Sequence, residues 1–137
     1  TYNGNVRAAM GDLDKAIELD PNNADAYYNR AYLKEEAEDF EGAMSDYNKV
    51  VGFNPEDDRA YYDLANTKMA VGDFGGALGP INKAIELKES NPSYYKMKGN
   101  IQYRMNQPSG ACKSWQKALE LGDKKSQYNL DQYCKQY

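Results

Sequence analysis

The chain of 137 residues contains no histidine. Histidine is the commonest general base and metal ligand in proteins, and every Ser-His or Cys-His nucleophile pair needs it. Most hydrolase mechanisms are therefore excluded. Glu35, Glu36 and Glu38 could still exchange protons with a substrate, but they lie in a charged run typical of a solvated helix face. We expect a protein that is not an enzyme and that holds no cofactor or metal.

Positive charge is also scarce, because 17 lysine and arginine residues face 21 acidic residues and leave a net charge of −4. A nucleic-acid surface needs a clustered positive field, so we expect no nucleic-acid partner. No stretch approaches the roughly 18 apolar residues of a membrane helix, and we expect no membrane insertion. The first residue is Thr1, without an initiator methionine or a leader. We interpret the chain as processed or trimmed, which leaves its compartment open between the cytoplasm and export after leader removal.

Glycine is concentrated in residues 72–79, which read GDFGGALG. A phosphate-binding loop would need a preceding strand and usually a lysine, and neither is visible. The stretch is instead one copy of a repeat with a period of 34 residues. The other copies are residues 4–11 (GNVRAAMG), 38–45 (EDFEGAMS) and 106–113 (NQPSGACK). Their shared alanine column consists of Ala9, Ala43, Ala77 and Ala111.

Further columns at the same period predict two helices in each unit. Leu13, Ala16 and Leu19, with their equivalents in later units, place apolar residues on one helical stripe. Upstream in each unit, a tyrosine column and a small-residue column predict another amphipathic helix. These columns are Tyr27, Tyr61 and Tyr95, and Ala31, Ala65 and Gly99. We expect the small residues of the two helices to face each other across a hairpin, where they allow close backbone approach.

The pattern resembles the tetratricopeptide repeat family, including short bacterial members. The resemblance covers nearly the whole chain and is carried by Tyr27, Ala31, Phe40, Ala43, Tyr47, Pro55, Tyr61, Leu64, Ala65, Gly72, Phe74, Ala77, Ala84, Tyr95, Gly99, Ala111, Trp115 and Ala118. It implies an all-α, right-handed solenoid of antiparallel helix pairs. Pro108, Glu89 and Pro80 depart from the family pattern. We expect Pro80 to kink or delay its helix because it cannot donate a backbone N–H.

The register divides a single domain, residues 1–137, into a half repeat at 1–23, repeats at 24–57, 58–91 and 92–122, and a capping helix at 123–137. In the half repeat we expect Gly4 in the turn before the second helix and residues 1–3 at the end of a missing first helix. The final segment places Leu130, Tyr133, Cys134 and Tyr137 at helical spacing among polar residues, as a cap requires.

The first helix has no cap, so we expect apolar groups such as Val6 and Leu13 to be under-covered. Two interpretations stay open: further repeats precede residue 1 in the natural protein, which we favour, or a second copy of the chain covers this face in a homodimer.

Cys112 and Cys134 are too few for a disulfide scaffold and are not spaced for a metal site. Cys112 lies early in its helix and Cys134 late in the cap, so antiparallel packing would bring the two thiols close together. Two buried free thiols are the favoured interpretation. The alternative is a disulfide, which would indicate an oxidising compartment.

A third stripe on each first helix is left uncovered by its hairpin and is expected to line the concave wall of the solenoid. These candidate groove residues are Asp25, Tyr28, Tyr32, Glu35, Arg59, Tyr62, Asn66, Met69, Ser93, Lys96, Asn100, Tyr103 and Arg104. The family resemblance implies that this wall binds a peptide or helix of another protein. The alternative function is a structural module that oligomerises through its first helix.

The charge of the candidate groove is uneven, with Asp25, Glu35 and Glu36 at one end and Lys96 and Arg104 at the other. We expect the basic residues of a bound segment to lie near the acidic end of the groove, and its acidic residues or a carboxylate to lie near Lys96 and Arg104. Relatives that clamp a chaperone carboxylate use lysine, arginine and asparagine at set positions. Here those positions hold Tyr28, Tyr32, Asp63, Ser93 and Met97. This clamp is therefore not predicted.

Overall fold

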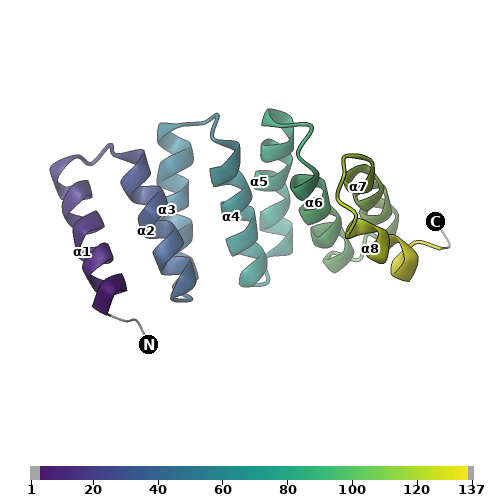
Figure 1. Ribbon diagram of the computed structural model, residues 1–137, viewed down its shortest axis with the longest axis horizontal. Coiled ribbons are helices and arrows are strands. Elements are labelled where there is room, and N and C mark those ends of the chain that lie inside the picture. Colours follow the sequence, from purple (N-terminus) through teal and green to yellow (C-terminus); the bar gives the residue numbers. More distant parts are fainter. Residues whose placement is uncertain (1–3, 136–137) are drawn as a thin grey trace.

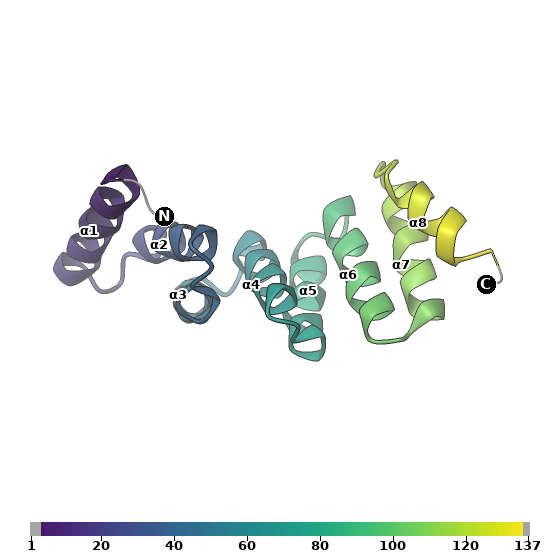
Figure 2. The same ribbon diagram turned by 90° about the horizontal axis from the view of Figure 1, so that it is seen from below.

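The computed structural model describes residues 4–135, which form eight helices and no strand. The helices are α1 (Gly4–Leu19), α2 (Ala24–Glu36), α3 (Phe40–Phe53), α4 (Asp58–Ala70), α5 (Phe74–Leu87), α6 (Pro92–Arg104), α7 (Pro108–Glu120) and α8 (Ser126–Tyr133). They follow one another along the long axis of the molecule, with α1 at one end and α8 at the other (Figures 1 and 2). The predicted all-α solenoid of helix pairs with a C-terminal capping helix is confirmed.

Asx caps explain where most of the helices begin. The side chains of Asn23, Asp39, Asp57, Asp73 and Asn91 each accept a hydrogen bond from a backbone amide in the first turn that follows. Such a cap satisfies one of the amides that a helix start leaves unpaired.

Two glycines of the 72–79 stretch have different structural roles at the start of α5. Gly72 adopts φ +82°, the left-handed conformation that glycine tolerates best, and so forms the turn before α5. Gly76 makes room for the capping carboxylate of Asp73, because a Cβ at this position would collide with that side chain. Gly42 and Asp39 show the same relation in the preceding pair. These helix-start roles account for both Gly72 and Gly76.

The small-residue columns lie in the core, where the paired helices meet. Ala31 of α2 and Ala43 of α3 are fully buried in one cluster with Tyr47. Ala65 of α4 and Ala77 of α5 are fully buried in the next cluster. Both clusters also contain residues of the following first helix, so each pair packs on its neighbour as well as on itself.

The expected turn at Gly4 and the expected delay of α5 at Pro80 are both wrong. Gly4 is the first residue of α1 and does not lie in a turn, while the expected end of an earlier helix, residues 1–3, lies outside the described residues. Pro80 lies inside α5 and does not delay it, since the helix runs without interruption from Phe74. A proline removes only one helical amide donor, and the turns on both sides of Pro80 keep the helix continuous.

The capping helix α8 is shorter than the segment predicted for it. It ends at Tyr133, Cys134 forms its C-cap, and Tyr137 lies outside the described residues. Ser126 is its buried residue and donates a hydrogen bond to Asp123 over 2.6 Å between the two side-chain oxygens. Leu130 is half-buried.

Candidate binding groove

The candidate groove residues lie on α2, α4 and α6, the first helices of the three pairs. None of them is fully buried. Tyr32 and Tyr103 are the most open of the aromatic ones, with 54% and 42% of their surface exposed.

A cavity of about 400 Å³ brings several of these residues together between α4 and α6. Its lining from the predicted set consists of Tyr62, Asn66, Met69, Ser93, Lys96 and Asn100. Met97 of α6 lines it too, together with Asp123 and Lys125 from the segment before α8. The sequence reasoning missed the last two because they follow the third complete repeat and belong to no repeated column of the groove.

A separate cavity of about 190 Å³ lies between α2 and α4, near their N-terminal ends. Asp25, Tyr28 and Arg59 of the predicted set line it, with Ala24, Val50, Asn54 and Asp57. The predicted residues are therefore divided between two hollows, and Tyr32, Glu35, Tyr103 and Arg104 line neither of them.

The candidate groove residues were predicted to be left uncovered by their own hairpins. This prediction is wrong for Tyr28 and Glu35. The ring of Tyr28 packs edge-on against Tyr47 of α3 with 5.6 Å between ring centroids, and its hydroxyl donates to Asp63 of α4. Glu35 accepts hydrogen bonds from the Tyr47 hydroxyl and the Asn66 amide, each at 3.0 Å. These side chains join α2, α3 and α4, because Tyr47 is long enough to reach the groove side of its own hairpin.

Burial sets the protonation of this network. It raises the pKa of Tyr28, and the hydrogen bond to Asp63 adds to the effect. Burial also raises the pKa of Asp63, helped by the charge of Glu35 and opposed by the Tyr28 hydroxyl. The pKa of Tyr62 is raised by burial and then by the Asp63 charge. The tyrosines therefore stay protonated at neutral pH and act as hydrogen-bond donors and packing surface.

Aromatic contacts close the C-terminal end of the groove. Tyr103 lies 4.6 Å from Tyr133 of α8 and 5.8 Å from Trp115 of α7, measured between ring centroids. Trp115 donates its indole N–H to the side-chain oxygen of Asn100 at 3.0 Å. The guanidinium of Arg104 lies 4.6 Å from the ring centroid of Phe74. Tyr103 and Arg104 thus have partners inside the chain.

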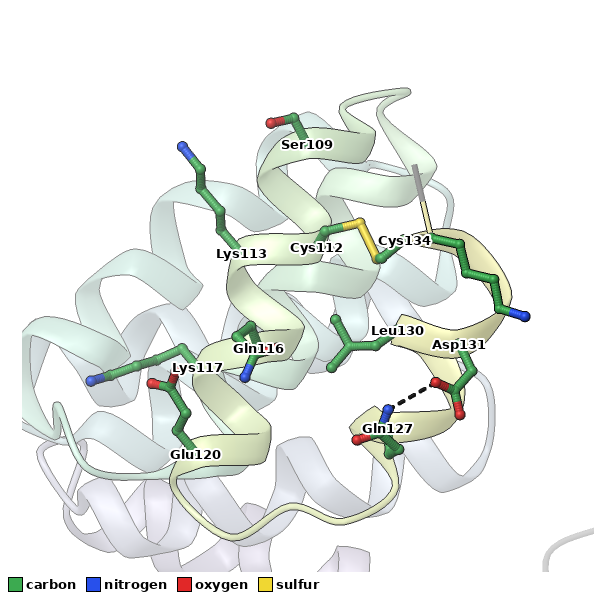
Figure 3. A pocket seen from close by; sticks show the side chains of 11 residues that line it. Ser109, Cys112, Lys113, Gln116, Lys117, Glu120, Gln127, Leu130, Asp131 and Cys134 are labelled. Atoms are coloured by element: carbon green, nitrogen blue, oxygen red, sulfur yellow. Dashed lines mark hydrogen bonds between the residues drawn. A yellow bond between two sulfur atoms is a disulfide. The ribbon is translucent and has the colours of Figure 1, made fainter. Parts of the chain in front are cut away.

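The structure joins Cys112 of α7 to Cys134, directly after α8, in a disulfide (Figure 3). It therefore describes the second of the two alternatives left open by the sequence. The bond lies at one side of a hollow of about 590 Å³ between α7 and α8.

Across the described residues 4–135, no helix combines the length and apolar character that a membrane span needs. The same part of the chain holds no group of three or more acidic, cysteine or histidine side chains placed to bind a metal.

Antiparallel helix pairs stacked in one row define the class of helical-repeat solenoids. Within that class, a family model described as tetratricopeptide repeat matches residues 13–44, from the second half of α1 to the start of α3. Among solved structures, a crystal structure of MamA matches with a TM-score of 0.83 and 26% identity, over 91% of this chain and 73% of MamA. Residues 13–44 therefore match a tetratricopeptide repeat, and the chain as a whole shares the fold of tetratricopeptide repeat proteins such as MamA.

Other solved structures share the same fold. YrrB, described as a TPR protein with an unusual peptide-binding site, matches with a TM-score of 0.74 and 26% identity, over 85% of this chain and 61% of YrrB. The first TPR of Spaghetti (RPAP3), bound to the HSP90 peptide SRMEEVD, matches with a TM-score of 0.76 over 80% of this chain and 89% of that one. At 18% identity, this last likeness concerns the fold alone. No curated protein sequence matches the chain.

Proposed function

We propose that this protein is a non-catalytic interaction scaffold that binds a peptide or helical segment of another protein along α2, α4 and α6. The observation that carries the proposal is the cavity of about 400 Å³ lined by Tyr62, Met69 and Lys96 together with polar side chains of α4 and α6. The lining is mainly polar, and Tyr62, Met69 and Met97 supply its apolar part. A ligand site combines such apolar contacts with polar groups that fix the orientation of the ligand.

Two further features support a protein ligand. Tyr32 offers an exposed ring with a hydroxyl beside the groove, and tyrosine is enriched among the residues that dominate binding energy. YrrB, at 26% identity, is described as having a peptide-binding site. We retain the expected polarity, in which basic residues of the ligand lie toward Asp25 and Glu36 and acidic residues toward Lys96.

Selection from a displayed library of random peptides tests the proposal even though the natural partner is unidentified. Peptides selected by the wild-type chain should bind the Tyr32→Ala/Lys96→Glu variant at least tenfold more weakly. Lys49→Glu is the matched control, since Lys49 is exposed on α3 and lines neither groove cavity. Circular dichroism should show the same helix content for all three proteins. Failure to select any peptide, or equal binding by the double variant, would contradict groove binding.

A second candidate function, self-association through α1, is favoured by one observation. Ala9, Leu13 and Ala16 of α1 are half-buried, and none of the residues of α1 is fully buried. The equivalent residues of α3, Ala43, Tyr47 and Val50, are at most 2% exposed because α2 covers them. The corresponding face of α1 lacks such a helix among the described residues, and a second copy of the chain would cover it.

Light scattering over a range of protein concentrations tests this second candidate. A dimer formed through α1 should be lost in Leu13→Glu and retained in Lys15→Glu, which changes an exposed residue of the same helix. A monomer at every concentration, or a dimer that is indifferent to Leu13→Glu, would contradict it.

A further inference from the structure

We infer that the capping segment, residues 123–134, completes the C-terminal end of the groove. With α6 it forms a subsite for an acidic side chain of the bound segment, and the Cys112–Cys134 disulfide keeps this subsite assembled. The inference rests on the proposed function, because it assigns a ligand chemistry and a redox dependence to the same groove.

The charge of the cavity lining identifies the ligand chemistry. Lys96 of α6 and Lys125 of the capping segment both line the cavity, and neither ammonium group has an ion-pair partner among the described residues. Asp123 is the one carboxylate of this lining, and it already accepts a hydrogen bond from the Ser126 hydroxyl. The lining therefore has a formal charge of +1, from two lysines and one aspartate, in a chain whose net charge is −4. An acidic side chain is its electrostatic complement.

The far end of α8 acts on the same cavity through aromatic contacts. Tyr133 lies 4.6 Å from Tyr103 and 5.9 Å from Trp115 between ring centroids. Trp115 in turn holds the side chain of Asn100, which lines the cavity. The capping segment thus supplies Lys125 to the subsite at its start, and at its end it supports the residue that orients Asn100.

The disulfide is the strongest attachment of this segment. The eight residues of α8 are fewer than an isolated helix needs to be stable in water, and Ser126 is the buried one among them. The disulfide bonds Cys134, the neighbour of Tyr133, to Cys112 of α7 (Figure 3). A dithiol reductant would donate two electrons and two protons, leave two cysteine thiols and become a disulfide itself. We expect α8 then to leave Trp115 and to withdraw Lys125 from the cavity.

Trp115 reports on this release without any ligand, because it is the single tryptophan of the chain. Adding dithiothreitol to the oxidised protein should shift its emission to longer wavelength and accelerate hydrogen exchange of the α8 amides. The Cys112→Ser/Cys134→Ser variant should match the reduced protein and should not respond to the reductant. Unchanged emission and exchange on reduction would overturn the role of the disulfide.

The ligand chemistry is tested with the peptides that the oxidised wild-type chain selects from the random library. These peptides should share an aspartate or glutamate, and their affinity should fall at least tenfold on reduction and in Lys125→Glu. Lys124→Glu is the matched control, because Lys124 is exposed, carries the same charge and does not line the cavity.

Different failures have different meanings in this experiment. If no peptide is selected, both the inference and the proposed function are wrong. The peptides could instead need Lys96 and Tyr32 but bind equally well to Lys125→Glu and to the reduced protein. That result would support binding in the groove and contradict the subsite formed by the capping segment.

Discussion

Gly99 shows how a single hydrogen atom in place of a side chain determines the packing of two helices. It lies on α6, fully inside the hairpin, where a Cβ would stand 2.5 Å from the ring of Trp115. The equivalent positions in the earlier repeats hold Ala31 and Ala65, which meet the smaller Tyr47 and Ile81 in their hairpins. The indole of Trp115 is larger than the side chains of Tyr47 and Ile81, so the position opposite it must be glycine.

Gly99→Ala should therefore destabilise the protein, although alanine is the better helix former. We expect a loss of about 1–2 kcal/mol in the free energy of unfolding, because overpacking a filled core costs more than the propensity gain. Gly75→Ala is the control, since its Cβ would meet nothing within 4 Å and it is exposed. A gain of about 0.5 kcal/mol is expected there. Chemical denaturation measures both, and a stabilised Gly99→Ala protein would contradict the close contact.

At the scale of helices, one buried carboxylate connects α1, α2 and α3. Asp46 of α3 accepts two hydrogen bonds of 2.8 Å from the Arg30 guanidinium of α2 and pairs with Lys34 at 3.1 Å. Arg30 also reaches Asp14 of α1 at 3.0 Å. Burial opposes ionisation of Asp46, but the hydrogen bonds from Arg30 and Lys34 outweigh it and lower its pKa.

Asp46→Asn should cost about 3 kcal/mol at pH 7, because it leaves two cations partly buried without their anion. A carboxyl group with a lowered pKa stabilises the fold above its unfolded pKa of about 3.9, and this stabilisation is lost as the pH falls through the folded value. The difference between wild type and variant should therefore shrink below about pH 4. Asp14→Asn, at a carboxylate that is 59% exposed, should change stability by less than about 1 kcal/mol. Thermal unfolding from pH 3 to pH 7 measures both differences.

The sequence predicted the helices well and the groove contacts less well, for a physical reason. A fixed period of 34 residues determines which face of each helix is apolar, and so the buried columns Ala43, Ala77 and Ala111 followed from it. The reach of long side chains between repeats depends on helix crossing angles and rotamers, which no period encodes. Tyr28 was expected to be free, yet it donates to Asp63, 35 residues later.

The cavity residues before α8 were not predicted for a different reason. Lys125 lies beyond the last complete repeat, so no column predicted its place. The same limit applies to the capping helix, which ends at Tyr133, directly before the disulfide-bonded Cys134. Prediction was therefore weakest where the chain departs from its repeat.

The molecule as a whole is a row of helices in which contacts are made mainly between neighbours in sequence. The free energy of unfolding is then approximately a sum of contributions from each helix and from the interfaces between neighbouring helices. A helix that packs on one neighbour should unfold locally more easily than a helix that packs on two. Helix α1 packs on α2 and has no fully buried residue. Helix α5 packs on both α4 and α6 and contains Ala77, Ile81 and Ala84, all fully buried.

Amides of α1 should accordingly exchange with solvent at least tenfold faster than those of α5 in the folded protein. Hydrogen exchange followed by mass spectrometry at two protein concentrations measures this gradient. If a second copy covers α1, its protection should rise with concentration while that of α5 stays constant, since mass action stabilises only the helix that the partner contacts. Equal protection of α1 and α5 in dilute solution would mean that the solenoid opens as one unit, which would contradict the local stability assigned to α1.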